Sequence, residues 1–221
     1  MRLHSYLKNN ANLTRSELMK LRNENRILVN GETTDLLYEV GFSDVITIDG
    51  KEITEQRKVY YLYNKPIGIE CTNSDRKPNN LKSLNLSSRV FSLGRLDKDS
   101  HGLLILTNDG KLSDKLMNAN SHVEKEYIVK TKYDIDEVFL DKMANGVMID
   151  GKMTKNAKIS KINDKCFDII ICEGRNRQIR KMTKACANYV IDLERIRIGK
   201  VMLGDLKLGE IKEVEINELI D

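Results

Sequence analysis

The sequence predicts an α+β protein with two modules, a small helical and β module at residues 1–50 and a larger domain at residues 58–221. Two observations support this prediction. The first module contains sequence signals for helix starts and for tight hairpin turns. The larger domain alternates short apolar runs of strand length with helical segments and lacks a regular βαβ rhythm, which favours a mixed, mainly antiparallel sheet. A polar linker, "KEITEQR" at residues 51–57, separates the two.

Residues 1–26 predict two helices. Apolar side chains at 3–7 mark a short first helix, and Thr14 followed by Glu17 three positions later is the capping box that starts the second. On the second helix the arginines recur at spacings that share one face, formed by Arg15, Arg22 and Arg26. Beyond it, the dipeptides "NG" at 30–31 and "DG" at 49–50 predict tight turns in a small β element.

Positive charge collects in two stretches of the chain. Residues 1–26 hold six basic and two acidic side chains, and residues 173–200 hold eight basic and three acidic ones. Residues 27–50, by contrast, hold five acidic side chains and no Lys or Arg. Such clustering is typical of a surface that binds a polyanion, although ordinary solvated helix faces are the alternative.

The composition argues against several classes of protein. No apolar run approaches the roughly 20 residues of a membrane-spanning helix, and "MRLHSYLKNN" has no signal-peptide core. The four cysteines form no C-x-x-C pair, so we expect reduced thiols in a cytoplasmic protein. The histidines are too scattered for a zinc site, and we expect no metal; they are His4, His101 and His122.

The larger domain is predicted to open with a buried strand and then to alternate strands with three helices. Expected strands are 59–63, 89–94, 102–109, 124–133, 165–174, 193–199 and 210–216. Expected helices are 108–118, 134–147 and 175–190, the last beginning near Asn176 with Tyr189 on its inward face. The polar stretch at 75–85 is expected to be a loop.

Asp97 is the first candidate for chemistry. It lies in "GRLDKDSHGLLILTNDG", where a strand ends, and loops at strand ends often carry catalytic groups. Arg95 and Lys98 flank it, and positive neighbours favour an ionised carboxylate. The alternative is a turn aspartate in a solvated ion pair.

A second cluster is "EGRNRQIRKM", where a strand leads into a helix. A helix N-terminus carries partial positive charge and suits an anion, and Arg177 with Lys181 continues a basic stripe along the helix. Arg180 lies on the first turn and could reach a cleft, or it could serve a structural ion pair. Tyr127, in the alternating segment "EKEYIVK", is the third candidate, and a core position is its alternative.

These three segments occur together and in this order, and they resemble signatures of the RNA pseudouridine synthases. More narrowly they resemble the RsuA/RluB/RluE/RluF family, with "RLDKDS" and "HVEKEY" most similar to the RluF branch. "NKPIGIECT" and "LERIRIGKVMLGDLKLGEIKEV" fit the same family. The segment "RLHSYLKNNANLTRSELMKLRNENRILVNGE" resembles the RNA-binding domain typed by ribosomal small-subunit protein S-four.

The resemblance implies a cofactor-free enzyme that isomerises uridine in RNA to pseudouridine on a flipped-out base. It implies that Asp97 is the essential carboxylate, attacking the ribose anomeric carbon or uracil carbon 6, or assisting expulsion of the base. Arg180 is expected to pair with Asp97, Tyr127 to stack on the base, and Arg95 to enter the gap that the base leaves. Expected RNA contacts are Arg15, Arg22, Arg26, Lys65, Arg95, Lys98, Arg175, Arg177, Gln178 and Lys181.

The same resemblance implies ribosomal RNA as substrate, with the large subunit favoured, and leaves transfer RNA open as a further target. We also expect a cytoplasmic monomer. Two rival functions remain at this point. One is a non-catalytic RNA-binding or ribosome-assembly protein on the same scaffold, which would have no need of Asp97, Tyr127 and Arg180 together. The other is a metal- or nucleotide-dependent RNA enzyme, which the lack of clustered ligands and of G-x-x-x-x-G-K disfavours.

Overall fold

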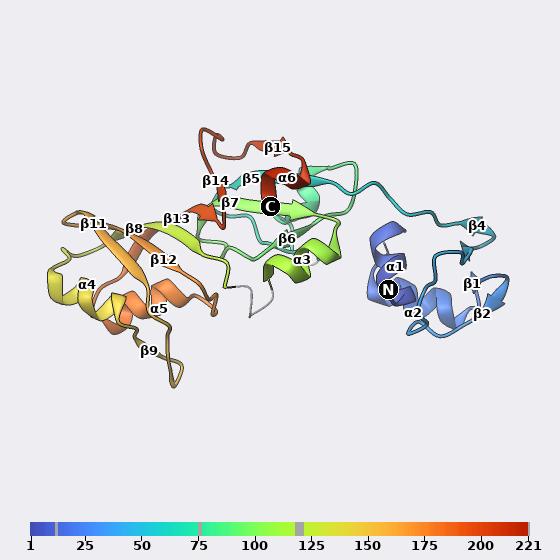
Figure 1. Ribbon diagram of the computed structural model, residues 1–221, viewed down its shortest axis with the longest axis horizontal. Coiled ribbons are helices and arrows are strands. Elements are labelled where there is room, and N and C mark those ends of the chain that lie inside the picture. Colours follow the sequence, from blue (N-terminus) through green and yellow to red (C-terminus); the bar gives the residue numbers. More distant parts are fainter. Residues whose placement is uncertain (12, 75–76, 118–121, 221) are drawn as a thin grey trace. The chain divides into compact units, whose positions relative to one another are not determined.

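The computed structural model describes residues 1–11, 13–74, 77–117 and 122–220, and the chain divides into two compact units (Figure 1). One unit comprises Met1–Lys58 with Ser87–Arg89, and the other comprises Val59–Leu86 with Val90–Asp221. In the described part of the chain, no helix has the length and apolar character needed to cross a membrane.

The N-terminal unit combines two helices with a small sheet. Its elements are α1 Leu3–Asn10, α2 Arg15–Asn23, β1 Ile27–Val29, β2 Glu32–Thr33, β3 Ile46–Ile48 and β4 Lys51–Glu52, with strand order β2-β1-β3-β4. The Thr14 hydroxyl accepts the Glu17 N–H and the Glu17 carboxylate accepts the Thr14 N–H, so the predicted capping box is confirmed. The two predicted turns are also confirmed, because positive φ angles occur at Asn30, Gly31, Asp49 and Gly50.

The end of this sheet differs from the predicted module boundary. The linker is predicted from residue 51, but Lys51 pairs with Ile48 and Glu52 with Thr47. The turn at 49–50 reverses the chain, so the residues after it pair with those before it. The first two residues of the predicted linker are therefore part of β4.

The second unit is built on a nine-stranded sheet. Its strands are β5 Tyr60–Lys65, β6 Phe91–Leu93, β7 His101–Thr107, β8 Lys125–Thr131, β11 Lys158–Asn163, β12 Cys166–Ile171, β13 Val190–Ile198, β14 Val201–Met202 and β15 Ile211–Glu213. Seven of them follow the order β11-β12-β8-β13-β7-β5-β15, while β14 pairs with β13 and β6 with β7. Strands β13 and β7 run parallel and the other described pairs are antiparallel, which confirms the predicted α+β class and mixed sheet.

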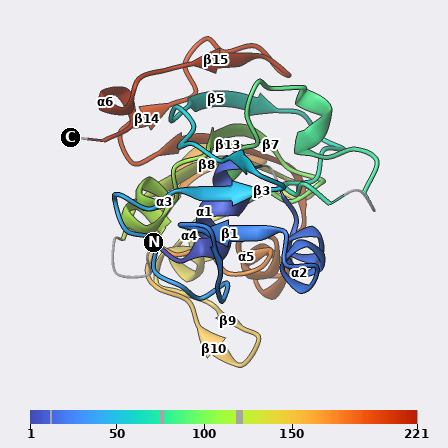
Figure 2. The ribbon, with the colours of Figure 1, turned by 90° about the vertical axis from the view of Figure 1, so that its right-hand side faces the viewer.

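Helices cover this sheet and complete two cores. The remaining elements are η1 Leu81–Leu84, α3 Gly110–Met117, α4 Glu137–Ala144, the hairpin β9 Met148–Ile149 with β10 Lys152–Met153, α5 Gln178–Ala185 and α6 Ile216–Leu219. Helices α4 and α5 lie along the β11–β12–β8 part of the sheet (Figures 1 and 2), where the rings of Phe139 and Phe167 meet edge to face. Leu104 faces this core, whereas Leu103 faces a second core with Leu112 of α3, so β7 is buried on both faces.

Three local predictions are wrong. The stretch predicted as a loop at 75–85, of which 75 and 76 lie outside the described residues, contains η1, capped by the Asn80 side chain. Helix α5 begins at Gln178 rather than near Asn176, because Arg177 has a left-handed backbone (φ 51°) that cannot continue a helix. Tyr189 is 50% exposed, because the helix already ends at Ala185 and the chain then turns into β13.

Gly102 fixes how closely β7 approaches β13. Its φ is +103°, and a Cβ added there would lie 2.4 Å from the Arg195 carbonyl oxygen and 2.7 Å from the Arg195 nitrogen. We therefore predict that Gly102→Ala lowers the free energy of unfolding by about 2 kcal/mol or more. An alanine there would have an unfavourable φ angle, and its Cβ would overlap the Arg195 backbone. Urea unfolding measures this. The matched control is Gly151→Ala, which also has positive φ but open space around it and should cost less.

Asp168 on β12 gives a pH-dependent prediction. Burial, and then the neighbouring Glu126, raise its pKa to about 6, and its Oδ1 has no partner among the described residues. The folded state thus favours the protonated acid, so stability from this group is present at low pH and is lost as pH rises from about 4 to about 6. Asp168→Asn should therefore stabilise the protein more at pH 7.5 than at pH 5 in urea unfolding.

Asp164→Asn on the neighbouring turn is the matched control for that experiment. An ion pair with Lys161 lowers the pKa of Asp164, so its removal should give no gain at neutral pH. A stability difference between wild type and Asp168→Asn that is the same at both pH values would show that Asp168 does not titrate as described.

Candidate active site

A cleft of about 700 Å³ lies within the second unit. The loop that follows β6, the start of β8, and the segment that joins β12 to α5 all contribute to its walls. Asp97, Tyr127 and Arg177 line it, each from a different one of these elements. The volume is within the range of about 300–1,000 Å³ that is usual for sites that enclose a small molecule.

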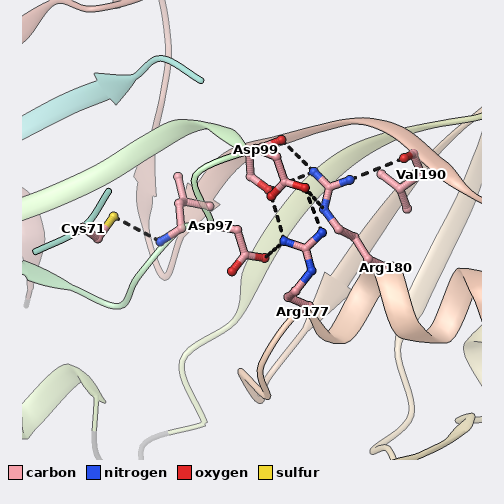
Figure 3. A network of polar contacts seen from close by, with 8 residues as sticks. Cys71, Asp97, Asp99, Arg177, Arg180 and Val190 are labelled. Atoms are coloured by element: carbon pink, nitrogen blue, oxygen red, sulfur yellow. Dashed lines mark hydrogen bonds and ion pairs between the residues drawn. The ribbon is translucent and has the colours of Figure 1, made fainter. Parts of the chain in front are cut away.

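The backbone on both sides of Asp97 is held in place. The N–H of the preceding Leu96, a buried residue, lies 3.4 Å from the Cys71 Sγ that accepts it (Figure 3). On the other side, the Ser100 N–H donates to the Asp97 carbonyl oxygen at 3.1 Å, which closes a turn. The Asp97 side chain itself is 31% exposed, so its carboxylate is open to a ligand in the cleft.

Tyr127 lies on β8 and is buried. In the sheet, Tyr127 pairs with Ile169 of β12 on one side and with Arg195 of β13 on the other. The side chain belongs to the main core and also lines the cleft, so the core and functional interpretations of this residue are compatible. A rigidly packed ring in a cleft wall is suited to stacking on a planar ligand.

The charged groups around Asp97 form one network, shown in Figure 3. Arg177 reaches Asp97 with 3.6 Å between Nη1 and Oδ2. The same guanidinium donates to both carboxylate oxygens of Asp99, at 2.9 and 2.8 Å. These contacts lower the pKa of Asp99 and raise that of Arg177, as a charge-assisted pair should.

Arg180 does not have its predicted partner. The family resemblance implies a pair with Asp97, but the ion pair of Arg180 is with Asp99, with 3.4 Å between Nε and Oδ2. Its Nη2 donates to the Asp99 carbonyl oxygen at 2.7 Å and to Ser100 Oγ at 3.2 Å, and its Nη1 donates to the Val190 carbonyl oxygen at 3.4 Å. The reason is that Asp99 offers a carboxylate and a backbone oxygen together, so the half-buried guanidinium satisfies more of its donors there.

Lys65 is a second correction. The resemblance predicts that it contacts RNA, but it is completely buried in β5, where its Nζ donates to the carbonyl oxygens of Pro66 and Ile69 at 2.9 and 3.0 Å. Burial lowers its pKa. An ammonium group enclosed in this way cannot reach a phosphate, and it supports the chain segment that follows β5.

Other predicted contact residues are already engaged in holding α5. Arg175 donates to the carbonyl oxygens of Lys152 and Met153 at 3.1 and 3.3 Å, which ties the β9–β10 hairpin to the start of the helix. Gln178 is buried and accepts the Arg175 N–H at 3.0 Å, although both residues also line the cleft. Lys181 pairs with Asp150 of the hairpin at 2.6 Å.

Two predicted contacts near Asp97 remain accessible. Arg95 is exposed and lines the cleft. Lys98 is also exposed, and its nearest carboxylate is Glu70 at 3.8 Å. These side chains are free to move toward an anionic ligand, in contrast to Lys65 and Arg175.

The three arginines of the N-terminal unit differ in how strongly they are held. Arg15 is exposed at the start of α2, and Arg22 lies 3.5 Å from Asp35. Arg26 is bound by Asp49 at 2.6 and 2.5 Å and by Glu24 at 2.9 Å, and these contacts raise its pKa. Arg26 is therefore the least available of the three for RNA.

The sequence interpretation missed Arg195. Its side chain is 1% exposed and lines the cleft, and it donates from Nε to the Leu103 carbonyl oxygen at 2.8 Å and from Nη1 to the Arg95 carbonyl oxygen at 3.3 Å. It thus ties the start of the loop that carries Asp97 to strand β7, which follows that loop. The sequence does contain a signal for this burial. Arg195 is two residues after Leu193, so in an alternating strand both side chains lie on the same, buried face.

An accessible carboxylate beside guanidinium groups and a buried tyrosine can act as a nucleophile or as a base toward a planar ligand. Among the described residues, no group of three or more His, Cys, Asp or Glu side chains is placed to hold a metal ion.

Comparisons with known proteins identify the family to which the chain belongs. The family model described as RNA pseudouridylate synthase matches residues 59–185. Over 100% of its length the chain is 37% identical to the dual-specificity RNA pseudouridine synthase RluF of Escherichia coli strain K12, of which it covers 78%. It is 34% identical to the ribosomal large subunit pseudouridine synthase B of Bacillus subtilis, over 82% of this chain and 79% of that protein.

Two further similarities extend these matches. The chain is 31% identical to the ribosomal small subunit pseudouridine synthase A of Haemophilus influenzae, over 91% of this chain and 90% of that protein. A crystal structure of a pseudouridylate synthase matches with a TM-score of 0.71 and 30% identity, over 99% of this chain and 98% of that one. The chain therefore belongs to the RNA pseudouridine synthases of the family that includes RsuA, RluB and RluF, and it is an RNA-modifying isomerase.

Proposed function

We propose that this enzyme converts specific uridines of large-subunit ribosomal RNA to pseudouridine, with transfer RNA as a second target and Asp97 as the attacking carboxylate. The observation that supports the residue assignment is the cleft, where Asp97, Tyr127 and Arg177 meet from three separate elements. The substrate assignment is supported by the names of the relatives, which include a dual-specificity enzyme and a large-subunit enzyme. We further propose a monomer that acts in the cytoplasm, where such RNA is found.

The proposed reaction breaks the bond between uracil and ribose, rotates the base and rejoins it through a carbon atom. A base stacked inside an RNA helix is out of reach, so the target must be extruded, at a cost of a few kcal/mol. Stacking on Tyr127 offsets part of this, since base–aromatic stacking contributes about 1–3 kcal/mol. Arg95, which is exposed and lines the cleft, is proposed to enter the gap that the base leaves.

The N-terminal unit is proposed to bind RNA phosphates and not to take part in the chemistry. Its helix α2 presents Arg15 and Arg22, which are exposed and held weakly or not at all by carboxylates among the described residues. Arg26, also predicted as a contact, is pinned by Asp49 and Glu24 and is assigned a smaller part. Residues 1–50 remain our proposal for an S-four-type RNA-binding domain, joined through 51–57 to the catalytic domain at 58–221.

The proposed chemistry gives a prediction for Asp97. Asp97→Asn keeps the shape of the side chain but removes the charge and the nucleophile, so pseudouridine formation should fall by a factor on the order of 1,000 or more while RNA binding persists. Carbodiimide-dependent reverse-transcription stops, mapped on ribosomal and transfer RNA from cells that contain either form, measure the activity and also locate the uridine.

Asp205→Asn is the matched control, because Asp205 is exposed and does not line the cleft. Normal turnover by purified Asp97→Asn would remove Asp97 from the chemistry. Loss of RNA binding together with activity would instead assign it to substrate binding.

The proposed RNA-binding role of the N-terminal unit gives a prediction for α2. Arg15→Ala combined with Arg22→Ala should weaken RNA binding and make its salt dependence shallower, by roughly 0.9 in the log–log slope for each phosphate that is no longer neutralised. Turnover at saturating RNA should be unchanged. Filter binding over a salt series measures the slope, and Lys161→Ala with Lys165→Ala removes the same charge from the β11–β12 edge as a control. An identical slope in the arginine variant and wild type would exclude α2 from the RNA surface.

A further inference from the structure

Two tyrosine rings of the second unit are exposed side by side, although the proposed reaction does not use them. Tyr133 lies just after β8 and Tyr189 just before β13, and they are 49% and 50% exposed. Their ring centroids are 6.4 Å apart with 68° between the planes, so the rings meet edge to face. Neither ring belongs to the hydrophobic clusters of the chain. The pair is therefore presented to solvent and does not build the core.

The backbone that carries both rings is fixed by Asn188, which is only 3% exposed. Its Oδ1 accepts the N–H groups of Tyr133 and Tyr189 at 3.1 and 2.8 Å, and its Nδ2 donates to the Tyr133 carbonyl oxygen at 3.0 Å. The Lys132 N–H donates to the Tyr189 carbonyl oxygen at 2.9 Å. Groups that are held in place before a ligand arrives lose less conformational entropy on binding it. This frame thus suits the two rings to a planar ligand.

A basic side chain lies beside the tyrosine pair. The Nζ of Lys132 is 5.2 Å from the centroid of the Tyr133 ring, within the range of a cation–π contact. Lys132 is exposed, and it forms no ion pair in the part of the chain that the structure describes. The neighbouring carboxylate of Asp134 is paired with Lys165 at 3.7 Å. The charge of Lys132 is therefore available to an anion.

Helix α5 connects these residues to the cleft. Arg177, which lines the cleft, directly precedes α5, and the Arg180 guanidinium donates to the carbonyl oxygen of Val190, the residue after Tyr189, at 3.4 Å. The eight residues of α5 span about 12 Å. The tyrosine pair thus lies on the order of one such helix length from the cleft wall. An RNA substrate is far larger than its target nucleotide, so nucleotides that flank the target can reach this distance.

We propose that Lys132, Tyr133 and Tyr189 form a second RNA-binding surface, which holds an unpaired base on the tyrosine pair and a neighbouring phosphate on the ammonium group. Aromatic rings with adjacent cations bind single-stranded nucleic acid with little demand on its sequence. The inference deepens the proposed function, because it names the class of RNA that is recognised as one with unpaired nucleotides beside the target. It rests on the proposed function only in that the substrate is RNA.

Removal of both rings should weaken binding of single-stranded RNA. In Tyr133→Ala with Tyr189→Ala, the Kd for a short oligouridylate should rise between about 5-fold and 100-fold, the effect of one lost base stack. Tyr133→Phe with Tyr189→Phe keeps the rings and should bind like wild type. A fully paired RNA duplex, whose bases are stacked inside, should bind the alanine variant and wild type equally. Fluorescence anisotropy of labelled RNA with purified full-length protein measures these affinities.

A tryptophan in place of Tyr189 reports the stacking directly. The chain contains no tryptophan, so Tyr189→Trp carries a single reporter whose emission should be quenched when oligouridylate binds. Phe42→Trp is the matched control, because Phe42 is fully exposed but lies in residues 27–50, which hold no Lys or Arg. Its emission should not change. Lys132→Gln should make the salt dependence of oligouridylate binding shallower by roughly 0.7 in the log–log slope, the value for one phosphate of a single strand.

Unchanged oligouridylate affinity in the double alanine variant, or an equal loss in the double phenylalanine variant, would overturn the inference. So would unquenched emission of Tyr189→Trp, and a protein would then be the partner that these rings fit. Asn188 contacts only backbone atoms of the tyrosines, so the alanine variant keeps its frame. If it still folds poorly, the tryptophan and Lys132→Gln results decide. Normal turnover by Asp97→Asn would overturn the proposed chemistry alone, because these binding measurements need no turnover.

Discussion

The site depends on the close approach of two parallel strands at Gly102 and Arg195. Arg195 of β13 pairs with Gly102 of β7 on one side and with Tyr127 of β8 on the other, and Gly102 in turn pairs with Lys65 of β5. One row of paired residues across four strands therefore sets the position of Tyr127 relative to the loop that precedes β7. Only glycine leaves room for this approach, because any Cβ would overlap the Arg195 backbone. The Arg195 side chain then ties the start of that loop to β7, through the carbonyl oxygens of Arg95 and Leu103.

The charges of the site are organised by competition between neighbouring groups. Asp97 and Asp99 lie two residues apart and face two guanidinium groups from the α5 segment. A carboxylate gains most from a two-pronged contact, and only one of the two can have it from Arg177. The left-handed backbone of Arg177, which ends the loop and starts the helix, places its side chain where it reaches both. The local backbone thus decides which carboxylate takes the two-pronged contact.

Sequence reasoning succeeded where the determinants are local. The Thr14–Glu17 capping box and the two Gly-containing turns depend on a few adjacent residues, and alternation along β8 placed Tyr127 on the buried face. It failed for Arg180, whose partner is Asp99, 81 residues away, and for Lys65, whose ammonium group is enclosed by the carbonyl oxygens of Pro66 and Ile69. The start of α5 was misplaced because an arginine in a left-handed conformation carries no sequence signal comparable to glycine. The individual role of each site residue stays a prediction, since membership of the family does not test it.

The basic side chains of the second unit divide into those that build the site and those that can bind. Lys65, Arg175 and Arg195 donate to backbone carbonyl oxygens, and Lys181 is paired with Asp150. Groups satisfied in this way contribute little to the release of counterions from RNA, because they must first give up a protein partner. Fewer positive side chains near the cleft are therefore available to bind RNA than the composition of residues 173–200 indicates. If the proposed function holds, we expect affinity for RNA to come largely from exposed groups such as Arg95 and Lys98 and from α2.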